Sequence, residues 1–237
     1  MIFDSGIKMK TEKEKFLREL KKNNISGPVL DAFAYVEQEV FFPKTVGMNY
    51  YEMRPLPVGF GEKSDDPLLL AQMIDILAPK DTWRLLEVGA GSGYSSAVLS
   101  CMVKELVTVE YNERLARLAK EKLIDNGFFN VRTFAGDAGD ITGELGSFDG
   151  LIILPACMLR PLKLLAALKF NEFAVFPMGP ALQQQLVKYK NTTIGDSDTL
   201  RNFTFYRFCD VPSIRGEYGW IDQYEMPEEG PGDSSGE

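Results

Sequence analysis

The sequence predicts an α/β protein in which helices flank a mainly parallel sheet, with a helical extension at the N-terminal end. Three observations predict this class. From Asp81 onward, short apolar or β-branched runs alternate with helical segments, which is typical of βαβ crossovers. A glycine-rich turn at residues 89–93 follows the first of these runs. Before Asp81, apolar residues recur at helical spacing and no such alternation occurs.

The first third of the chain is expected to form three helices and one ordered loop. The first helix begins with Thr11 as its cap and ends near Asn23, and the second begins at Gly27. The third runs from Pro67 to Leu77, with proline in its first turn. Between residues 50 and 67, prolines restrict the backbone and glycines allow it to turn, which predicts an ordered loop.

The remainder is expected to form seven strands and two long helices. The strands are short apolar or β-branched runs, namely Arg84–Val88, Leu106–Glu110, Val131–Phe134, Phe148–Leu154, Phe173–Phe176, Gln185–Tyr189 and Phe203–Phe208. The helices are expected over Tyr94–Val103 and Glu113–Asn126, with Gly127 closing the second in a left-handed conformation. In such a sheet a ligand binds beyond the carboxyl ends of the strands.

The composition excludes several kinds of chemistry. The 237 residues include no histidine, so Ser-His-Asp and Cys-His catalysis and histidine metal sites are ruled out. Cys101, Cys157 and Cys209 lie far apart, among apolar neighbours and without a CxxC spacing. They are expected to be small buried side chains, and no metal site is predicted.

The charges are unevenly distributed along the chain. The net charge is −8, and residues 221–237 hold six acids and no base, which leaves −2 for residues 1–220. This ending is expected to be a disordered acidic tail.

Non-specific nucleic-acid binding would need a basic face, which argues against nucleic acid as a partner. The longest apolar run, Leu151–Leu159, is too short to cross a membrane, and the first residues lack the apolar core of a signal peptide. The sequence therefore predicts a cytoplasmic protein.

Three acids at successive strand ends indicate a nucleoside-type ligand. Glu87 precedes the glycine-rich turn, Glu110 ends the second strand, and Asp137 follows the third. The turn has the spacing GxGxG instead of the GxGxxG of dinucleotide sites, with its glycines at Gly89, Gly91 and Gly93. Glu87 would repel a pyrophosphate and attract an ammonium group, and Glu110 can accept both hydroxyls of a ribose. The alternative is that these residues are only turn glycines and solvated acids.

This pattern resembles class I S-adenosylmethionine-dependent methyltransferases, which have a Rossmann-like sheet flanked by helices. The resemblance implies that Glu87 lies by the methionine moiety of S-adenosyl-L-methionine and that Glu110, followed by Tyr111, holds the ribose. It also implies that Asp137 and Ala138 face the adenine, and that S-adenosyl-L-homocysteine is the product. Methyl transfer from a sulfonium to a carboxylate needs no general base, which fits a chain without histidine.

Two motifs narrow the resemblance to one family. Residues 54–61 read RPLPVGFG and residues 87–94 read EVGAGSGY. Both are similar to motifs of the protein-L-isoaspartate O-methyltransferases, RPLPIGxG and EIGTGSGY, in the same order, and residues 208–220 resemble the closing segment of that family. The resemblance implies a carboxyl O-methyltransferase that acts on isoaspartyl carboxylates in damaged proteins or peptides, and a monomer.

The chain is accordingly divided into three parts. Residues 1–80 are expected to form the N-terminal helical segment and substrate loop, and residues 81–220 the S-adenosylmethionine-binding domain. Residues 221–237 are the acidic tail.

The departures from the family lie where its substrate is expected to bind. A family serine that contacts the substrate carboxylate corresponds to Asp65 here, with Ser64 one residue earlier, and these two are the catalytic candidates. The family histidine that follows is Leu68, and a family threonine after the fourth strand is Leu154. An ionised Asp65 about 4 Å from an acceptor carboxylate would cost on the order of 4 kcal/mol. Asp65 could instead be protonated, or Ser64 could take its place.

Three alternatives remain open at this point. Residues 64–66 could simply form a solvated loop and an N-cap for the helix at Pro67. The enzyme could methylate a different carboxylate, such as an unmodified aspartate of a particular peptide. The chain could also be a non-catalytic module that binds S-adenosylmethionine.

Overall fold

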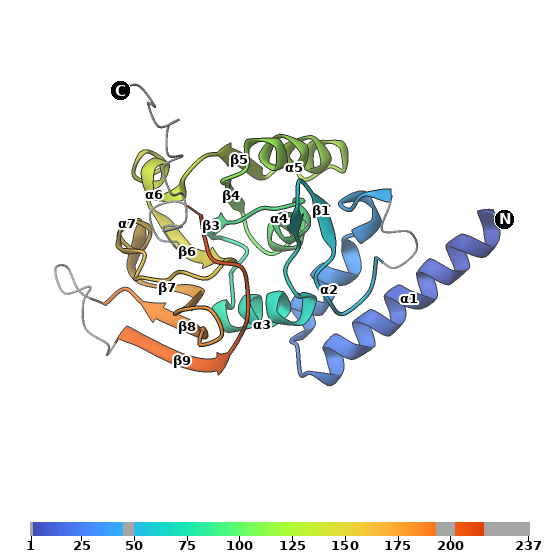
Figure 1. Cartoon of the computed structure of the whole chain (residues 1–237), viewed down its shortest axis with the longest axis horizontal. Coiled ribbons are helices and arrows are strands. Elements are labelled where there is room, and N and C mark those ends of the chain that lie inside the picture. Colours follow the sequence, from blue (N-terminus) through green and yellow to red (C-terminus); the bar gives the residue numbers. More distant parts are fainter. Residues whose placement is uncertain (1, 45–49, 193–201, 216–237) are drawn as a thin grey trace, which may run out of the picture.

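A seven-stranded sheet forms the centre of the computed structural model, which describes residues 2–44, 50–192 and 202–215 (Figure 1). Its strands follow the chain as β3 (Arg84–Val88), β4 (Glu105–Glu110), β5 (Val131–Ala135), β6 (Phe148–Ile153), β7 (Leu168–Met178), β8 (Gln185–Lys190) and β9 (Phe203–Phe208). All seven predicted strands are therefore confirmed. β7 is much longer than expected, because the prediction used only its apolar part, and residues 169–172 of the strand are largely exposed.

The strands are arranged in the order β5-β4-β3-β6-β7-β8-β9. The predicted parallel pairing holds from β5 to β7, whereas β8 pairs antiparallel with both of its neighbours. Only residues 179–184 connect β7 to β8, and a parallel crossover needs a dozen or more residues. The chain moves outward from β3 to β5 and then returns to place β6 on the other side of β3, which makes the β3–β6 boundary the switch point of the sheet.

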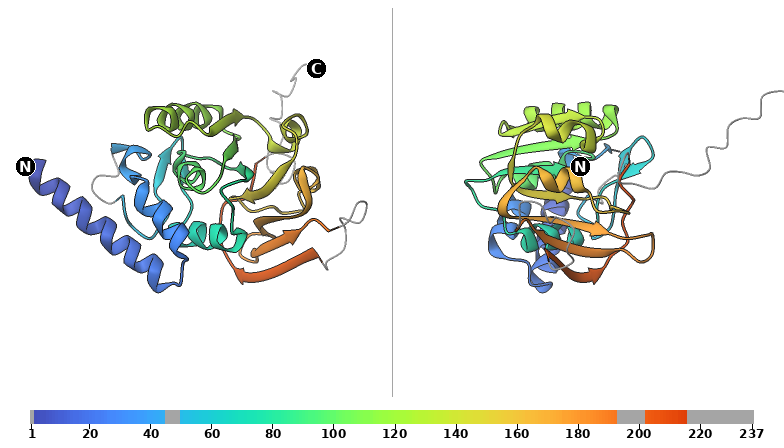
Figure 2. Two further views of the ribbon diagram at one scale, coloured as in Figure 1. Left: turned by 180° about the vertical axis from the view of Figure 1, so that it is seen from behind. Right: turned by 90° about the vertical axis from the view of Figure 1, so that its left-hand side faces the viewer.

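Helices cover both faces of this sheet. They are α1 (Ile2–Lys22), α2 (Gly27–Tyr35), α3 (Pro67–Leu77), α4 (Tyr94–Ser100), α5 (Glu113–Asp125), α6 (Ala138–Ile141) and α7 (Leu162–Ala166), with short 3-10 turns at Gln38–Val40 and Thr142–Glu144. α1 and β9 lie at opposite ends of the molecule (Figures 1 and 2). The short helices α6 and α7 were not predicted, because four or five residues are too few to show a helical period.

Two helix boundaries differ from the predictions. α1 begins at Ile2, so Thr11 lies inside the helix and does not cap it. A polar residue that can cap a helix is also tolerated on its exposed side, which is why this signal was misleading. α4 ends at Ser100 instead of Val103, whereas the predicted bounds of α3 are confirmed.

Alternating strand residues divide the core between the two faces of the sheet. Leu85 of β3 packs with side chains from α1 to α5, whereas its neighbour Leu86 packs with α6 and α7. On the first face, Phe16 of α1 contacts Phe33 of α2, and Phe33 contacts Tyr94 of α4, with ring centroids 6.0 and 6.1 Å apart. The N-terminal helices therefore share one core with the sheet, across the expected division at residue 80.

The predicted ordered loop is a small hairpin. β1 (Pro57–Gly59) pairs antiparallel with β2 (Glu62–Lys63), and the turn between them has positive φ at residues 59–61. Leu56 and Val58 are buried and anchor this segment in the core. The hairpin is therefore held at a defined place above the sheet.

One prediction about the cysteines is wrong. Cys157 is buried and Cys209 is partly buried, but Cys101 is exposed, because α4 ends just before it and the chain turns at the surface. In the part of the chain that the structure describes, no helix is both long and apolar enough to cross a membrane. The acidic tail, residues 221–237, and Gly216 to Trp220 of the family-like closing segment lie outside the described residues.

Candidate active site

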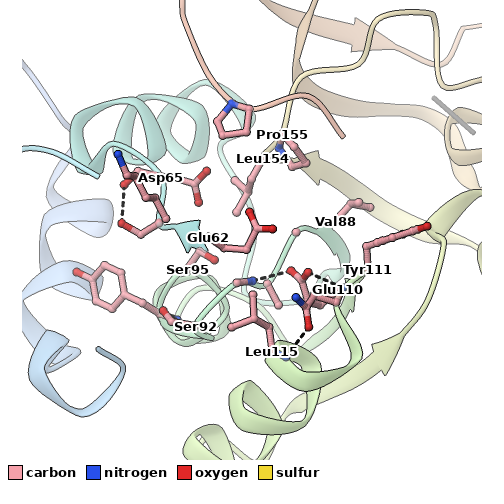
Figure 3. A pocket seen from close by; sticks show the side chains of 18 of the residues that line it. Glu62, Asp65, Val88, Ser92, Ser95, Glu110, Tyr111, Leu115, Leu154 and Pro155 are labelled. Carbon is pink, nitrogen blue, oxygen red and sulfur yellow. Dashed lines mark hydrogen bonds between the residues drawn. The ribbon is translucent and has the colours of Figure 1, made fainter. Parts of the chain in front are cut away.

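A pocket opens at the switch point of the sheet, beyond the carboxyl ends of its strands. One end, here called the glycine-turn end, is formed by Gly91, Glu110, Tyr111, Leu115, Gly136 and Ala138. The other, the hairpin end, is formed by Arg54, Glu62, Ser64, Asp65, Leu154 and Arg215. Figure 3 shows Glu62 and Asp65 on one side of the pocket and Glu110 and Tyr111 on the other. Two chemically different surfaces thus face one space.

Each of the three positions in the turn requires glycine for a structural reason, and the reason differs between them. All have positive φ. A Cβ on Gly89 would lie 2.8 Å from Cδ of Pro155, and one on Gly93 would lie 3.2 Å from the Cβ of Ala119. A Cβ on Gly91 would meet nothing within 4 Å. Gly89 and Gly93 therefore allow close packing, whereas Gly91 leaves its backbone open to a ligand in the pocket.

Glu110 holds this open turn in place. Its Oε2 accepts a hydrogen bond from the backbone N–H of Gly91 at 2.8 Å, and its Oε1 accepts one from Asn112 at 2.9 Å. The side chain lies on the pocket wall and is only 9% exposed. Each carboxylate oxygen keeps further acceptor capacity, so the group can also receive two hydroxyls of a ligand.

Glu87 is completely buried behind the pocket wall. The hydroxyl of Ser96 donates a hydrogen bond to its Oε2, and Oε1 has no partner among the described residues. Burial raises the pKa of the Glu87 carboxyl, and the charge of Glu110 adds to the increase. Glu87 therefore lies behind the pocket wall, which Ser95 and the glycine-rich turn both help to form.

The third strand end contributes backbone and a small side chain. Gly136 and Ala138 form part of the pocket wall, whereas Asp137 caps α6 by accepting a hydrogen bond from the N–H of Gly139 at 2.8 Å. Tyr111 is 48% exposed and lies at the edge of the glycine-turn end. Of the residues expected to hold a cofactor, Gly89, Gly91, Glu110, Tyr111 and Ala138 line the pocket, and the others support it.

The side chains of the two catalytic candidates differ in their hydrogen bonds. The hydroxyl of Ser64 accepts a hydrogen bond from the N–H of Leu56 at 3.0 Å and donates one to the carbonyl of Asp65 at 3.1 Å. Asp66 caps α3 by accepting from the N–H of Leu69 at 2.9 Å, as the capping alternative predicts. Asp65, between them, is partly buried and lies on the pocket wall.

The acidic surroundings of Asp65 affect its titration. Burial and the negative charges of Glu87 and Glu110 raise its pKa to about 7. Leu154 lines the same end of the pocket and is buried, so this part of the wall is apolar where the resemblance implies a threonine. Leu68 is half-buried against the core and does not line the pocket.

The sequence did not identify the charged residues at the mouth of the hairpin end. Arg215 pairs with Glu62 of β2 across 153 residues of chain, and Arg54 pairs with Glu52. Arg54 is part of the RPLP motif, which is a signal that could have found it. Arg215 follows β9 with no local signal, because only folding brings it to the hairpin.

Comparisons with known proteins identify the family of this chain. The family model described as Protein-L-isoaspartate(D-aspartate) O-methyltransferase (PCMT) matches residues 11–208. A protein-L-isoaspartate O-methyltransferase of Petrotoga mobilis is 34% identical over 204 residues, which are 85% of this chain and 94% of that protein. One from Roseiflexus castenholzii is 34% identical over 198 residues, covering 83% and 88% of the two chains.

Solved structures show the same fold. A protein-L-isoaspartate O-methyltransferase superposes with a TM-score of 0.77 at 23% identity, covering 87% of this chain and 67% of that one. A Plasmodium falciparum protein described by the same enzyme name, in complex with S-adenosyl-L-homocysteine, gives 0.71 at 18% identity, covering 85% and 97%. Since the family match and its relatives extend over more than four fifths of the chain, this protein belongs to the protein-L-isoaspartate(D-aspartate) O-methyltransferase family.

Proposed function

We propose that this chain is an S-adenosyl-L-methionine-dependent carboxyl O-methyltransferase that esterifies isoaspartyl carboxylates in damaged proteins or peptides. The observation that carries the proposal is the pocket itself. Its glycine-turn end suits a nucleoside, and its hairpin end, built from the RPLP loop, suits an acceptor. The family match supports the same activity.

The residues at the glycine-turn end fit S-adenosyl-L-methionine. The open backbone at Gly91 allows a ligand to approach, and the Glu110 carboxylate beside it can accept the ribose hydroxyls. Gly136 and Ala138 offer a small, flat surface to the adenine. We propose that Glu87 acts indirectly, by fixing the turn and keeping an acidic group near the amino end of the cofactor.

The reaction requires positioning more than proton transfer. When bound, S-adenosyl-L-methionine would supply a methyl group attached to a positively charged sulfur. The acceptor carboxylate oxygen would take the methyl group, the sulfur would leave as a neutral thioether, and no proton would be released. The residues of this chain therefore need to orient the acceptor and exclude water. Leu154, Leu56 and Ile214 supply apolar wall for this purpose, and the absence of histidine costs the reaction nothing.

The test is a methylation assay with matched peptides. The purified protein is incubated with labelled S-adenosylmethionine and an isoaspartyl or an aspartyl peptide of the same sequence, with Glu110→Ala as the control variant. Base-labile methyl ester on the isoaspartyl peptide alone is the expected result. Ester only on the aspartyl peptide would favour the different-acceptor alternative. Ester on neither, with the cofactor still bound, would favour the non-catalytic module.

Further expectations belong with this proposal. The activity implies a peptide or damaged protein as the partner. Four other points stay predictions. They are a monomeric state, the absence of nucleic-acid partners, a cytoplasmic location and the division of the chain at residues 80 and 220. Analytical ultracentrifugation of the purified protein checks whether it is a monomer.

A further inference from the structure

We propose that Asp65 is the acceptor-binding group of this enzyme and acts as a neutral acid, donating a hydrogen bond from its protonated carboxyl to the acceptor carboxylate. It follows that the enzyme binds its acceptor well only while Asp65 holds a proton. This inference rests on the proposed function and assigns one residue of this chain to the recognition of its substrate.

Among residues 64–66, the hydrogen bonds leave the side chain of Asp65 available to a ligand. The hydroxyl of Ser64 is engaged by the backbone at residues 56 and 65, and the carboxylate of Asp66 caps α3. These bonds fix the backbone on both sides of Asp65, whose side chain lies on the wall of the hairpin end (Figure 3). The backbone that carries Asp65 is therefore anchored on both sides.

The charged groups around Asp65 oppose its ionisation. Acids face it from three elements, namely Glu87 of β3, Glu110 at the end of β4 and Asp66 of its own loop. The cations at the hairpin end do not pair with Asp65: Arg215 pairs with Glu62, Arg54 pairs with Glu52, and Lys63, which also lines the pocket, is exposed. Among residues 2–44, 50–192 and 202–215, no cation forms an ion pair with Asp65. Together with burial, these acids raise its pKa to about 7.

A donor at this position suits the reaction and a base does not. Methyl transfer to a carboxylate releases no proton, so a general base would have nothing to accept. An ionised Asp65 would repel the acceptor, whereas a protonated one forms a short, strong O–H···O⁻ hydrogen bond with it. Leu154, which is buried in the wall of the same end of the pocket, adds apolar surface there, and a hydrogen bond is stronger where the local dielectric is low.

The test is the pH profile of kcat/KM for the isoaspartyl peptide at saturating S-adenosylmethionine, from pH 5.5 to 8.5. The product to measure is S-adenosylhomocysteine, because the methyl ester itself decomposes faster as the pH rises. The wild-type value should fall by about tenfold per pH unit above the pKa of Asp65. Asp65→Asn keeps a neutral donor and should flatten the profile, while the exposed Asp125→Asn should leave it unchanged. The same alkaline decline in Asp65→Asn would overturn the inference.

A second variant tests the hydrogen bond itself. Asp65→Leu retains a side chain of similar size but cannot donate, so kcat/KM at pH 6 should fall at least tenfold below that of Asp65→Asn. Equal values for the two variants would overturn the inference.

Binding separates this inference from the proposed function. We would titrate the isoaspartyl peptide into protein saturated with S-adenosylhomocysteine, which cannot react, and measure the affinity by calorimetry at pH 6 and pH 8. Affinity that weakens at pH 8 in the wild type but not in Asp65→Asn supports the inference even if turnover fails. Absence of turnover would then contradict the proposed function alone, and affinity independent of pH would contradict the inference alone.

Discussion

At the scale of single residues, the site depends on carboxylates with different surroundings. Glu110 accepts two backbone hydrogen bonds and faces the pocket, whereas Glu87 is fully buried beneath it and Asp137 caps a short helix. The sequence placed all three at the same sheet edge, because parallel strands end together there. It could not distinguish their roles, because the direction of a side chain at a strand end depends on the turn that follows.

Glu110→Ala should weaken binding of S-adenosylhomocysteine by about 10- to 100-fold, because it removes the carboxylate that we propose accepts the ribose hydroxyls and it releases the N–H of Gly91. Calorimetric titration measures this affinity, and circular dichroism confirms that the variant is folded. Glu121→Ala, an exposed acid on α5, is the matched control and should bind normally. Unchanged affinity in Glu110→Ala would show that the ribose lies elsewhere.

Alanine at Gly89 should mainly lower stability, whereas alanine at Gly91 should mainly block cofactor binding. Gly89→Ala brings a Cβ to 2.8 Å from Pro155 and should lower the free energy of unfolding by about 2–3 kcal/mol. Gly91→Ala meets nothing within 4 Å and should cost only about 1 kcal/mol for its φ of +52°, but it should block cofactor binding. Urea unfolding and cofactor titration distinguish the two. A Gly91→Ala protein that binds the cofactor normally would show that the ligand does not approach the backbone of Gly91.

At the scale of elements, the hairpin of β1 and β2 forms the end of the pocket that we propose to bind the acceptor. Its prolines and positive-φ turn predicted an ordered loop, and the structure confirms that it is anchored by Leu56 and Val58. The pairing of Glu62 with Arg215 joins the hairpin to the segment after β9. That contact could not be predicted, because the two residues are far apart in the sequence and neither belongs to a motif with the other.

Ser64→Ala should loosen this hairpin. The substitution leaves the N–H of Leu56 without its side-chain partner and frees the carbonyl of Asp65, so the free energy of unfolding should fall by about 1–2 kcal/mol. The KM for the peptide should rise more than kcat falls, because the acceptor wall is displaced while the cofactor site remains. Ser147→Ala, at an exposed serine, serves as the control for both measurements. A large fall in kcat with unchanged KM would instead indicate that Ser64 takes part in the reaction.

At the scale of the whole molecule, acids buried near the pocket should make stability depend on pH. The folded-state pKa of Asp65, about 7, is above its ordinary value of 3.8, so the folded protein binds the extra proton between these pH values. Stability that is present at low pH is therefore lost as the pH rises toward 7, and burial of Glu87 acts in the same direction.

Asp65→Asn should remove part of this dependence. Relative to the wild type, the variant should gain about 2–3 kcal/mol in the free energy of unfolding between pH 5 and pH 8, because it cannot ionise. Urea unfolding at the two pH values measures the difference, and Asp125→Asn should track the wild type. A constant difference between variant and wild type would mean that Asp65 ionises freely in the folded protein.

The sequence by itself determined the seven strands of the sheet and the longer helices along the chain, the glycine-rich turn and the family, because these follow from periodicity, backbone conformation and short motifs that are local in the chain. Only the tertiary structure decided four other features. They are the antiparallel pairing of β8 and β9, the core that the N-terminal helices share with the sheet, the hydrogen bonds of the Ser64 hydroxyl and the position of Arg215. The state of Asp65 belongs to this second group. Its three acidic neighbours come from the ends of two strands and one loop, and the pKa of a carboxyl depends on burial and on charges brought near it by folding.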